Sequence, residues 1–391
     1  MPGALLSVVT AVAAYLVALL LAAFAIPRII SVARSKNLFD LPDNDRKIHK
    51  DVIPNLGGIG IFFAYIIVAS LFVDPAKFPR WTYISSATLI LFFTGMKDDL
   101  VSMTPFKKFL LQGVAAAIVV FFADLRIHSF YGLFGIEELP LLISQAFTII
   151  GCIFVTNAFN LIDGIDALAG SVSAMACLIL GTVFFLSGHQ CEALIAFSMG
   201  GAITGFLFFN KPPARIFMGD TGALVIGFTL SVLCVLMIEE AGTATGVNRV
   251  VHSPVGALLL SLAVLFAPLF DTFRIFTVRI LKGGSPFKAD RTHLHHYLLD
   301  LGLSHGKAVI IILIANTFIL LVAYLLQDIN PHLVIITMTL VAMSLFGVLF
   351  YKRQLKIEPS RSIRKSTRKF LRRRSVEKKP ERFVPRKSIS R

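Results

Sequence analysis

The chain has 391 residues, of which 56% are hydrophobic and only 16% are charged, whereas soluble domains carry about 25% charged residues. Some uncharged apolar runs reach 17 to 23 residues, the length that a helix needs to cross a bilayer core of about 30 Å. This composition excludes a soluble enzyme, a secreted disulfide scaffold and a membrane β-barrel. It predicts an all-α polytopic membrane protein.

Eleven apolar runs follow one another along the chain and predict about eleven transmembrane helices. They fall near residues 4–26, 56–73, 82–96, 108–123, 140–159, 165–187, 192–209, 220–238, 254–278, 308–326 and 332–351. No Lys or Arg precedes the first run, which is longer than the apolar core of a signal peptide, so we expect it to be retained as a span. No internal repeat is visible, which disfavours an inverted-repeat transporter.

The net charge of +15 is concentrated at the C-terminus. Residues 352–391 contain 17 Lys and Arg against three acidic residues, so that the rest of the chain carries only +1. We therefore predict an integral membrane domain at 1–351 and a basic, disordered cytoplasmic tail at 352–391. The tail is expected to lie on anionic lipids, with a solvated topogenic role as the alternative, and no nucleic acid is expected as a partner.

The distribution of positive charge also predicts the orientation in the membrane. With the C-terminus inside, the inner loops collect 17 Lys and Arg even without the tail, and the outer loops collect four, namely Lys77, Arg80, Arg126 and Arg249. Lys and Arg near span ends are retained on the cytoplasmic side. The sequence therefore predicts a cytoplasmic C-terminus and, with eleven spans, an N-terminus outside.

Four polar motifs interrupt the apolar chain, all on the predicted cytoplasmic side. They are G-M-K-D-D at 95–99, N-A-F-N-L-I-D-G-I-D-A-L at 157–168, F-M-G-D-T-G at 217–222 and H-L-H-H at 293–296. Charged groups near a membrane are costly, and function is their default explanation. A transport path would place ionisable groups at mid-membrane depth or on both sides. The one-sided arrangement therefore favours a membrane enzyme over the rival class, a transporter for an anionic solute.

The motifs supply five carboxylates, Asp98, Asp99, Asp163, Asp166 and Asp220, too many to stay ionised in one cleft without a cation. Oxygen donors favour Mg²⁺, with Mn²⁺ as the alternative, over zinc, because no thiolate accompanies the histidines. Asp220 alone could be only a helix cap, and Asp98 with Asp99 only an interfacial stop signal. Together with the basic, histidine-rich loop, the carboxylates predict phosphoryl transfer to an acceptor that lives in the bilayer.

At these motifs the sequence resembles the polyprenyl-phosphate N-acetylhexosamine-1-phosphate transferase family, which includes the WecA-type and TagO-type enzymes and the more distant MraY translocases. The resemblance covers roughly residues 1–350. It is strongest at R-K-I-H with P-N-L-G-G (46–58), at K-D-D with N-L-I-D-G-I-D-A-L, at F-M-G-D-T-G, and at K-G-G-S-P-F-K-A-D-R-T-H-L-H-H (282–296). The H-x-H-H form, with S-P-F and D-R before it, resembles the WecA and TagO branch more than MraY.

The resemblance implies a multi-pass enzyme of the bacterial inner (plasma) membrane, with its active site facing the cytoplasm. The implied reaction is attack by undecaprenyl phosphate on the β-phosphate of UDP-GlcNAc, which releases UMP and initiates a lipid-linked cell-envelope glycan. UDP-GalNAc and a UDP-linked deoxy N-acetyl sugar stay open as donors, because no residue is seen to read a sugar hydroxyl, and UDP-MurNAc-pentapeptide is a further alternative. A single displacement is favoured over a phospho-enzyme because a lipid phosphate is already largely ionised. The oligomeric state is open, and a homodimer is one option.

Carried over position by position, the resemblance also implies a role for each motif residue. The implied catalytic residues are Asp98, Asp99 and Asp163, with Asp98 as the base or orienting group for the lipid phosphate. The implied Mg²⁺ ligands are Asn160 and Asp220. The implied substrate-binding residues are Asp166, Asn210, Phe217, whose ring can stack on uracil, and Arg291, His293, His295 and His296, which hold the diphosphate and sugar.

Overall fold

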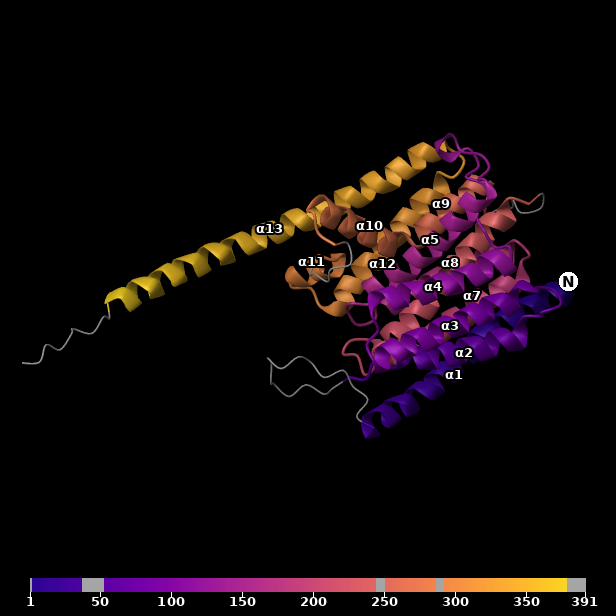
Figure 1. Ribbon diagram of the computed structural model, residues 1–391, viewed down its shortest axis with the longest axis horizontal. Helices are drawn as coiled ribbons and strands as arrows, with labels where there is room; N and C mark the ends of the chain where they lie inside the picture. Colours follow the sequence, from indigo (N-terminus) through magenta and orange to yellow (C-terminus); the bar gives the residue numbers. More distant parts are fainter. Residues whose placement is uncertain (1, 37–52, 244–249, 286–291, 378–391) are drawn as a thin grey trace, which may run out of the picture.

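The computed structural model describes residues 2–36, 53–243, 250–285 and 292–377 (Figure 1). Its elements in chain order are α1 (Pro2–Ser35), α2 (Gly57–Phe72), α3 (Arg80–Leu100), α4 (Pro105–Phe122), η1 (Leu133–Gly135), α5 (Leu141–Ile162), α6 (Leu168–Leu186), α7 (Gln190–Asn210), α8 (Gly219–Ala241), α9 (Pro254–Val264), α10 (Phe266–Leu281), α11 (Leu294–Asp300), α12 (His305–Leu325) and α13 (Pro331–Glu377). The β structure in these residues is one isolated bridge between Ser129 and Glu138. The fold is all-helical, as the apolar runs predict.

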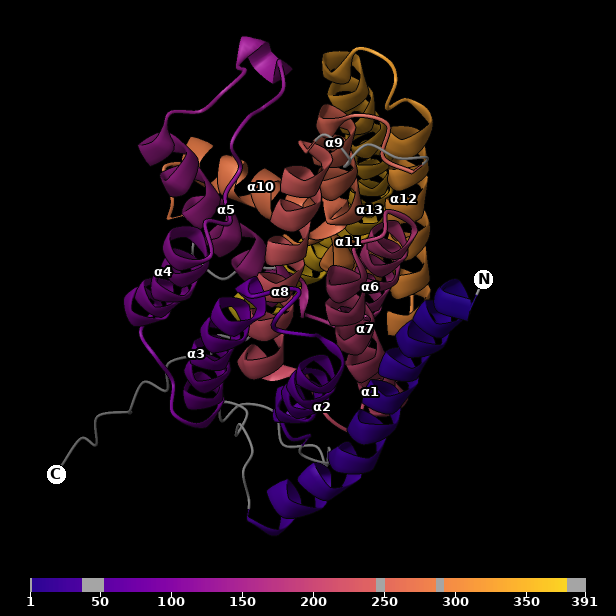
Figure 2. The same ribbon diagram turned by 90° about the vertical axis from the view of Figure 1, so that its right-hand side faces the viewer.

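The central helix of the bundle is α8. Figure 2 shows it surrounded by its neighbours, and α2, α3, α5, α6, α7 and α9 all pack against it. Its membrane-length stretch is buried throughout. A helix that is apolar on every side is expected in such a position. The start of α8, which carries the F-M-G-D-T-G motif, is therefore held by several other helices.

Among the described residues, eight helices are long and apolar enough to cross a membrane, or nine if α9 and α10 form one broken span. The apolar helix α2 has only 16 residues, and α3 carries charged residues near both ends. Each of the eleven predicted runs corresponds to one helix or to the broken pair. The protein is thus a multi-helix membrane protein, while the number of spans stays a prediction.

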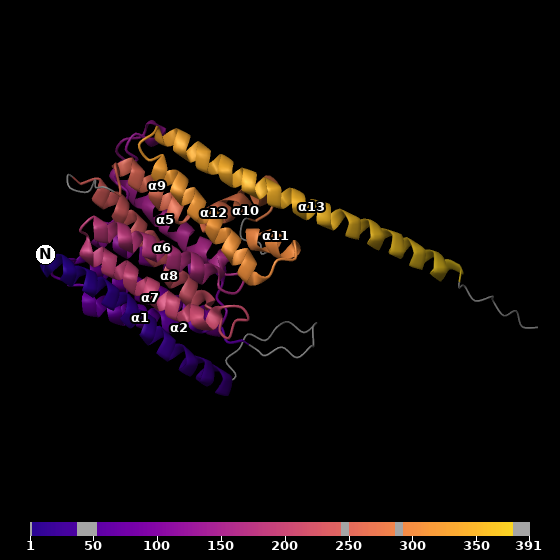
Figure 3. The same ribbon diagram turned by 180° about the vertical axis from the view of Figure 1, so that it is seen from behind.

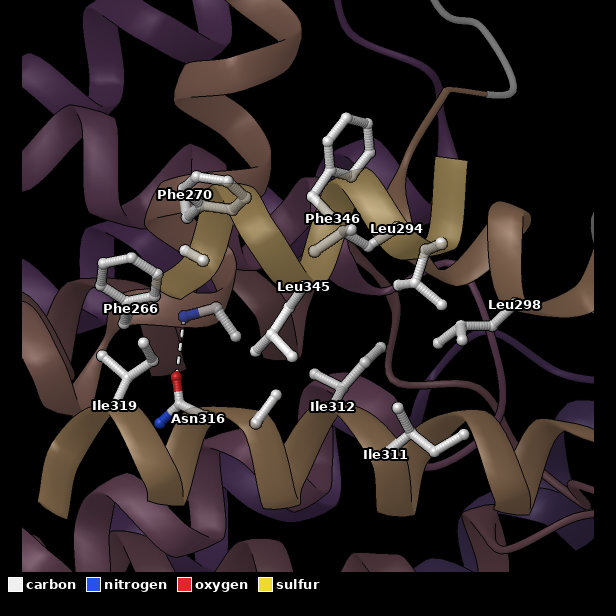
Figure 4. A pocket seen from close by; sticks show the side chains of 14 residues that line it. Phe266, Phe270, Leu294, Leu298, Ile311, Ile312, Asn316, Ile319, Leu345 and Phe346 are labelled. Carbon is white, nitrogen blue, oxygen red and sulfur yellow. Dashed lines mark hydrogen bonds between the residues drawn. The ribbon is translucent and has the colours of Figure 1, made fainter. Parts of the chain in front are cut away.

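The run at 254–278, predicted as one span, is two helices bent by 74°. Pro268 lies in the first turn of α10, where its missing N–H suits a helix start rather than a helix interior. Asn316 of α12 bridges the break, since its Oδ1 accepts from the Ala267 N–H at 2.8 Å (Figure 4). Its Nδ2 donates to the Val264 carbonyl at 3.2 Å. A buried amide thus satisfies backbone groups that a bent helix would leave unpaired in the bilayer.

The two ends of the bundle differ in what they carry. The chain starts at one end, and α13 protrudes from the other (Figures 1 and 3). The four polar motifs lie at the end from which α13 protrudes, because they form the end of α3, the end of α5, the start of α8 and the start of α11. The motifs therefore share one end of the bundle. That this end faces the cytoplasm stays a prediction.

Helix α13 continues well beyond the bundle and crosses the predicted boundary between residues 351 and 352. The part of the tail up to Glu377 is helical in the structure rather than disordered, in keeping with the high helix propensity of Lys and Arg. Residues 378–391 lie outside the described residues. Arg353 anchors α13 where it leaves the bundle, by an ion pair with Asp300 at 2.6 Å. The division of the chain into two parts stays a prediction.

Candidate active site

Lys108 brings two of the predicted site aspartates together. Its ammonium donates to the carboxylate of Asp98 at 3.1 Å and also pairs with Asp220. Asp98 further accepts from the backbone N–H of Met103 at 2.5 Å. Asn160 donates to Oδ1 of Asp220 at 2.5 Å. The ends of α3 and α5 and the starts of α4 and α8 thus contribute to one polar cluster, and Lys108 is the member that the sequence analysis did not assign to the site.

Asp99 has a different environment from its neighbour Asp98. Its carboxylate accepts from the N–H of Asp220 at 2.8 Å and from the N–H and hydroxyl of Thr221 at 2.9 and 2.5 Å. Asn55 donates to it at 3.1 Å. A carboxylate that accepts from the first N–H groups of a helix satisfies donors that have no partner within the helix. The structure therefore gives Asp99 a positioning role at the start of α8, and its catalytic role stays a prediction.

Two glycines allow this close approach of α3 to α8. Gly219 has a φ of +72°, and a Cβ there would lie 2.7 Å from the Asp99 carboxylate. A Cβ on Gly95 would collide with the backbone of Thr221. Only glycine combines a positive φ with the absence of a side chain. Gly95 and Gly219 are therefore explained by packing.

Asp163 directly follows α5, and its carboxylate lies among other acidic groups. Burial and then the charges of Asp220, Asp99 and Asp166 raise the pKa of Asp163 to about 7. A carboxylate whose charged form is disfavoured by burial and by like charges is typical of functional sites. This observation supports the predicted importance of Asp163 without assigning it a step.

The two adjacent aspartates titrate differently. Burial raises the pKa of Asp99 to about 6, although the hydrogen bonds from Thr221 and Asp220 lower it. Burial also acts to raise the pKa of Asp98, but its hydrogen bonds and the charge of Lys108 outweigh this, so that Asp98 titrates below its ordinary value. Asp98 is therefore held ionised at neutral pH, which is the form that accepts or orients a proton.

The histidine motif is oriented by a residue that the sequence analysis missed. The Nδ1 of His293 lies 2.9 Å from Oδ2 of Asp271, and Oδ1 of Asp271 accepts from the N–H of Leu294 at 3.1 Å and from Arg274 at 2.7 Å. Asp271 thus fixes both the ring of His293 and the start of α11. An acidic and a basic residue three positions apart inside an apolar run were the signal that could have found it.

His295 connects the histidine motif to the aspartate motif of α5. Its side chain is buried, with the residue 2% exposed, and a Cβ on Gly164 would collide with its Nε2. Its ring is 5.6 Å from that of His293 and 4.3 Å from that of His296. Burial and then His296 lower the pKa of His295 to about 4, so the ring is neutral at pH 7. Its Nδ1 has no hydrogen-bond partner in the described part of the chain, and a buried orphan nitrogen beside a polar site is available to a ligand.

Asn210, which the resemblance assigns to nucleotide contact, is enclosed by the protein. Its Oδ1 accepts from the N–H of Ala167 at 2.8 Å, and its Nδ2 donates to the carbonyl of Ile216 at 2.9 Å. The amide therefore ties the loop that carries Asp166 to the loop that carries Phe217. This geometry makes Asn210 a residue that positions these two loops, and contact of Asn210 with a nucleotide stays a prediction.

Asp166 and Phe217 are held on those two loops. Asp166 accepts from the N–H of Ala214 at 3.3 Å and lies 3.2 Å from Nδ1 of His305, which the sequence analysis did not assign to the site. The ring of Phe217 is accessible, with the residue 38% exposed. An exposed ring on a backbone-anchored loop can stack on a planar base. Arg291, the remaining predicted binding residue, lies outside the described residues.

The donor set at the cluster fits the predicted ion. Asn160 and Asp220 are hydrogen-bonded to each other, so one ion could reach an oxygen of each. The carboxylates of this cluster outnumber its one described ammonium, that of Lys108. Carboxylate and amide oxygens in a surplus of negative charge suit Mg²⁺, which takes its remaining ligands from water and phosphates.

An apolar pocket borders the histidine motif (Figure 4). It lies among α10, α11, α12 and α13, and Leu294 and Leu298 of α11 form part of its wall, together with Phe266, Phe270 and Phe346. Leu294 stands between His293 and His295 in the sequence. Polar groups able to hold phosphates and an apolar space able to hold hydrocarbon therefore lie next to each other.

Fold and site together define a membrane-embedded enzyme with a carboxylate and histidine centre at one end of a helical bundle. Comparison with known proteins identifies the family to which this enzyme belongs. Residues 81–238 match the model of glycosyl transferase family 4. The chain is 30% identical over 305 residues to a probable undecaprenyl-phosphate N-acetylglucosaminyl 1-phosphate transferase of Bacillus subtilis (strain 168), covering 77% of this chain and 80% of that protein.

A second relative covers more of the chain. The undecaprenyl-phosphate alpha-N-acetylglucosaminyl 1-phosphate transferase of Escherichia coli O157:H7 is 30% identical over 354 residues, which are 88% of this chain and 91% of that protein. The chain therefore belongs to glycosyl transferase family 4, in the branch of membrane phosphotransferases that the motifs predict. The predicted family membership and enzyme class are confirmed.

Proposed function

We propose that the chain transfers N-acetylglucosamine 1-phosphate from UDP-GlcNAc to undecaprenyl phosphate, in a Mg²⁺-dependent reaction that starts a lipid-linked cell-envelope glycan. The observation that carries the proposal is the convergence of Asp98, Lys108 and Asp220 at one end of a bundle whose histidine motif borders an apolar pocket. The names of the related proteins support the sugar and the lipid. UDP-GalNAc and UDP-MurNAc-pentapeptide remain the alternative donors.

In the proposed step, an oxygen of the lipid phosphate forms a bond to the β-phosphorus of the nucleotide sugar. The bond from that phosphorus to the bridging oxygen breaks, and UMP leaves with the bridging oxygen and its electron pair. Asp98, which is ionised and fixed by Lys108 and the Met103 N–H, orients the lipid phosphate and takes any proton it still carries. We favour this single displacement over a phospho-enzyme.

The other residues bind and orient the two substrates. Mg²⁺ held by Asn160 and Asp220 would neutralise charge on the diphosphate when bound. Asp99 keeps Asp220 in place through the start of α8. The neutral ring of His295 and the oriented ring of His293 lie where a sugar phosphate can accept or donate hydrogen bonds. The apolar pocket beside them is suited to the first isoprene units of the lipid.

The test is release of UMP by the purified full-length protein in detergent with UDP-GlcNAc, undecaprenyl phosphate and Mg²⁺. We expect release that requires both the lipid and the ion, and that EDTA abolishes. Parallel reactions with UDP-GalNAc and UDP-MurNAc-pentapeptide separate a different sugar from a different reaction. Silence with all three donors would contradict the proposal.

We further propose that the aspartate end faces the cytoplasm of the inner membrane, which the charge asymmetry of the loops supports. In a Cys191→Ser background, Ser304→Cys and Glu137→Cys place exposed thiols at opposite ends of the bundle. A membrane-impermeant thiol reagent applied to the outside of spheroplasts should label the cysteine at position 137 and spare the one at 304. The reverse pattern would invert the topology without affecting the proposed reaction.

A further inference from the structure

A second cluster of ligand-type side chains lies at the end of the bundle opposite to Asp98. The Nδ1 of His189 lies 3.6 Å from Oε2 of Glu240, and the carboxylate of Glu192 completes a group whose ligand atoms all lie within 4.8 Å of one another. His189 precedes α7, Glu192 lies in the first turn of α7, and Glu240 lies at the end of α8. The length of α8 separates this cluster from Asp220 by about 30 Å, at 1.5 Å per residue.

Glu192 is the unusual member of the cluster. It is only 6% exposed, its own backbone N–H donates to its carboxylate, and His189 is the cationic group that acts on it most strongly. Acidic residues in the first turn of a helix are common, but they normally stay in water. A carboxylate taken out of water is costly unless a cation or a set of donors compensates it, and buried charges are therefore paired or coordinate metals.

Two cations at this end, Arg80 and Lys77, are already paired with other carboxylates. Arg80 donates to both carboxylate oxygens of Glu239, at 3.0 and 2.7 Å, so the charges of these two side chains balance each other. The more exposed Lys77 lies 3.8 Å from Asp74. Two carboxylates, those of Glu192 and Glu240, then stay together without an ion pair to any described Lys or Arg. A doubly charged cation would balance them.

We infer that His189, Glu192 and Glu240 form a second divalent-metal site, separate from the catalytic centre, which ties the turn between α6 and α7 to the end of α8. One imidazole nitrogen and two carboxylate oxygens suit Zn²⁺, with water as the fourth ligand. In a tetrahedral site with bonds of about 2.1 Å, donors lie about 3.4 Å apart. The His189 Nδ1 and Glu240 Oε2 atoms, 3.6 Å apart, are close to this spacing. The ligand atom of Glu192 lies within 4.8 Å of both, and a change of its rotamer would bring it to bonding distance of the ion.

The first test measures bound zinc. The full-length protein in detergent is loaded with Zn²⁺, passed through a desalting column, and analysed for metal by mass spectrometry. We expect the wild type to retain one more zinc per chain than Glu192→Gln or His189→Asn. The same difference should appear in an Asp220→Asn background, because the catalytic cluster is a separate site.

The matched control is His252→Asn, which alters another histidine and carboxylate pair at the same end of the bundle. His252 lies 2.9 Å from Asp328, so this variant also removes a histidine and carboxylate contact at the same end of the bundle. His252→Asn should retain the zinc content of the wild type. A loss of zinc in this control equal to that in His189→Asn would overturn the assignment.

The second test is thermal unfolding with and without Zn²⁺. Zinc should raise the unfolding midpoint of the wild type and of His252→Asn, because a ligand that binds only the folded state stabilises it. It should leave the midpoint of Glu192→Gln unchanged, and this isosteric variant keeps the volume of the buried side chain. Equal zinc content and an equal zinc-induced shift in wild type and Glu192→Gln would refute the site and make Glu192 a buried protonated acid.

Discussion

The two ends of the bundle treat their charged residues in opposite ways. At the end opposite to the active site, ionic groups mostly form local pairs. These pairs are Arg80 with Glu239, Arg126 with Asp124, and His252 with Asp328. At the end with the candidate active site, two aspartates, Asp98 and Asp220, share one ammonium, that of Lys108, and neighbouring carboxylates help to raise the pKa of Asp163. Compensated charges hold helices together, whereas a surplus of one charge is arranged for a ligand.

The largest expected effect is that of Asp98→Asn. Because the amide can neither accept a proton nor hold Lys108 by charge, we expect kcat to fall about 10²- to 10⁴-fold. Unfolding temperature should change little. UMP release and thermal unfolding of the same preparation provide the measurement, and Asp328→Asn at the opposite end is the control. Retention of more than a tenth of the activity would remove Asp98 from its proposed role.

The pH dependence of stability should report on His295. Its folded pKa of about 4 lies below its ordinary value of 6.5. As pH falls below 6.5, the unfolded state binds a proton that the folded state does not, so this contribution is present above pH 6.5 and lost towards pH 4. The loss amounts to at most about 3 kcal/mol.

Thermal unfolding in detergent between pH 7 and pH 4 measures this contribution. His295→Gln should show a shallower fall in unfolding temperature than the wild type, because the titrating group is gone. His332→Gln, at the opposite end of the bundle, should follow the wild type. Identical slopes for wild type and His295→Gln would show that burial of this ring does not control its protonation.

A smaller effect is expected at the paired end. Arg80→Met leaves the largely buried Glu239 without its bidentate partner, which should cost about 2 kcal/mol of stability and leave kcat unchanged. Lys77→Met removes a far more exposed pair and should cost less than about 0.5 kcal/mol. Unfolding temperatures compare the two variants. Adding Glu239→Gln to Arg80→Met should recover part of the loss, and further destabilisation would contradict the pairing argument.

The smallest effect on turnover is expected from deletion of residues 357–391. The deletion keeps Arg353, whose ion pair with Asp300 anchors α13 to the bundle. We expect UMP release in detergent to stay largely intact, while binding to vesicles with anionic lipids weakens, since each basic residue near the surface contributes about 1 kcal/mol. A truncated protein that folds and inserts but has no activity would place the tail in the catalytic machinery.

Much of the architecture could be predicted from the sequence for a physical reason. A chain in lipid must satisfy its backbone hydrogen bonds within each segment, so long apolar runs become helices. The bend between α9 and α10 could not be predicted, because it depends on the Asn316 amide of α12, which reaches the exposed backbone groups from another helix. The amino-acid composition of the tail likewise did not predict that its first part, up to Glu377, continues helix α13.

In the candidate site, too, some features could be predicted from the sequence and others could not. Residue types and their order along the chain by themselves determined the family and the place of the motifs at helix ends, because these depend on local sequence. Only the tertiary structure decided that Asp99 caps α8 while Asp98 meets Lys108, and that Asp271 orients His293. These roles depend on which atoms of distant segments come within hydrogen-bond distance, and adjacent residues on a helix point in different directions.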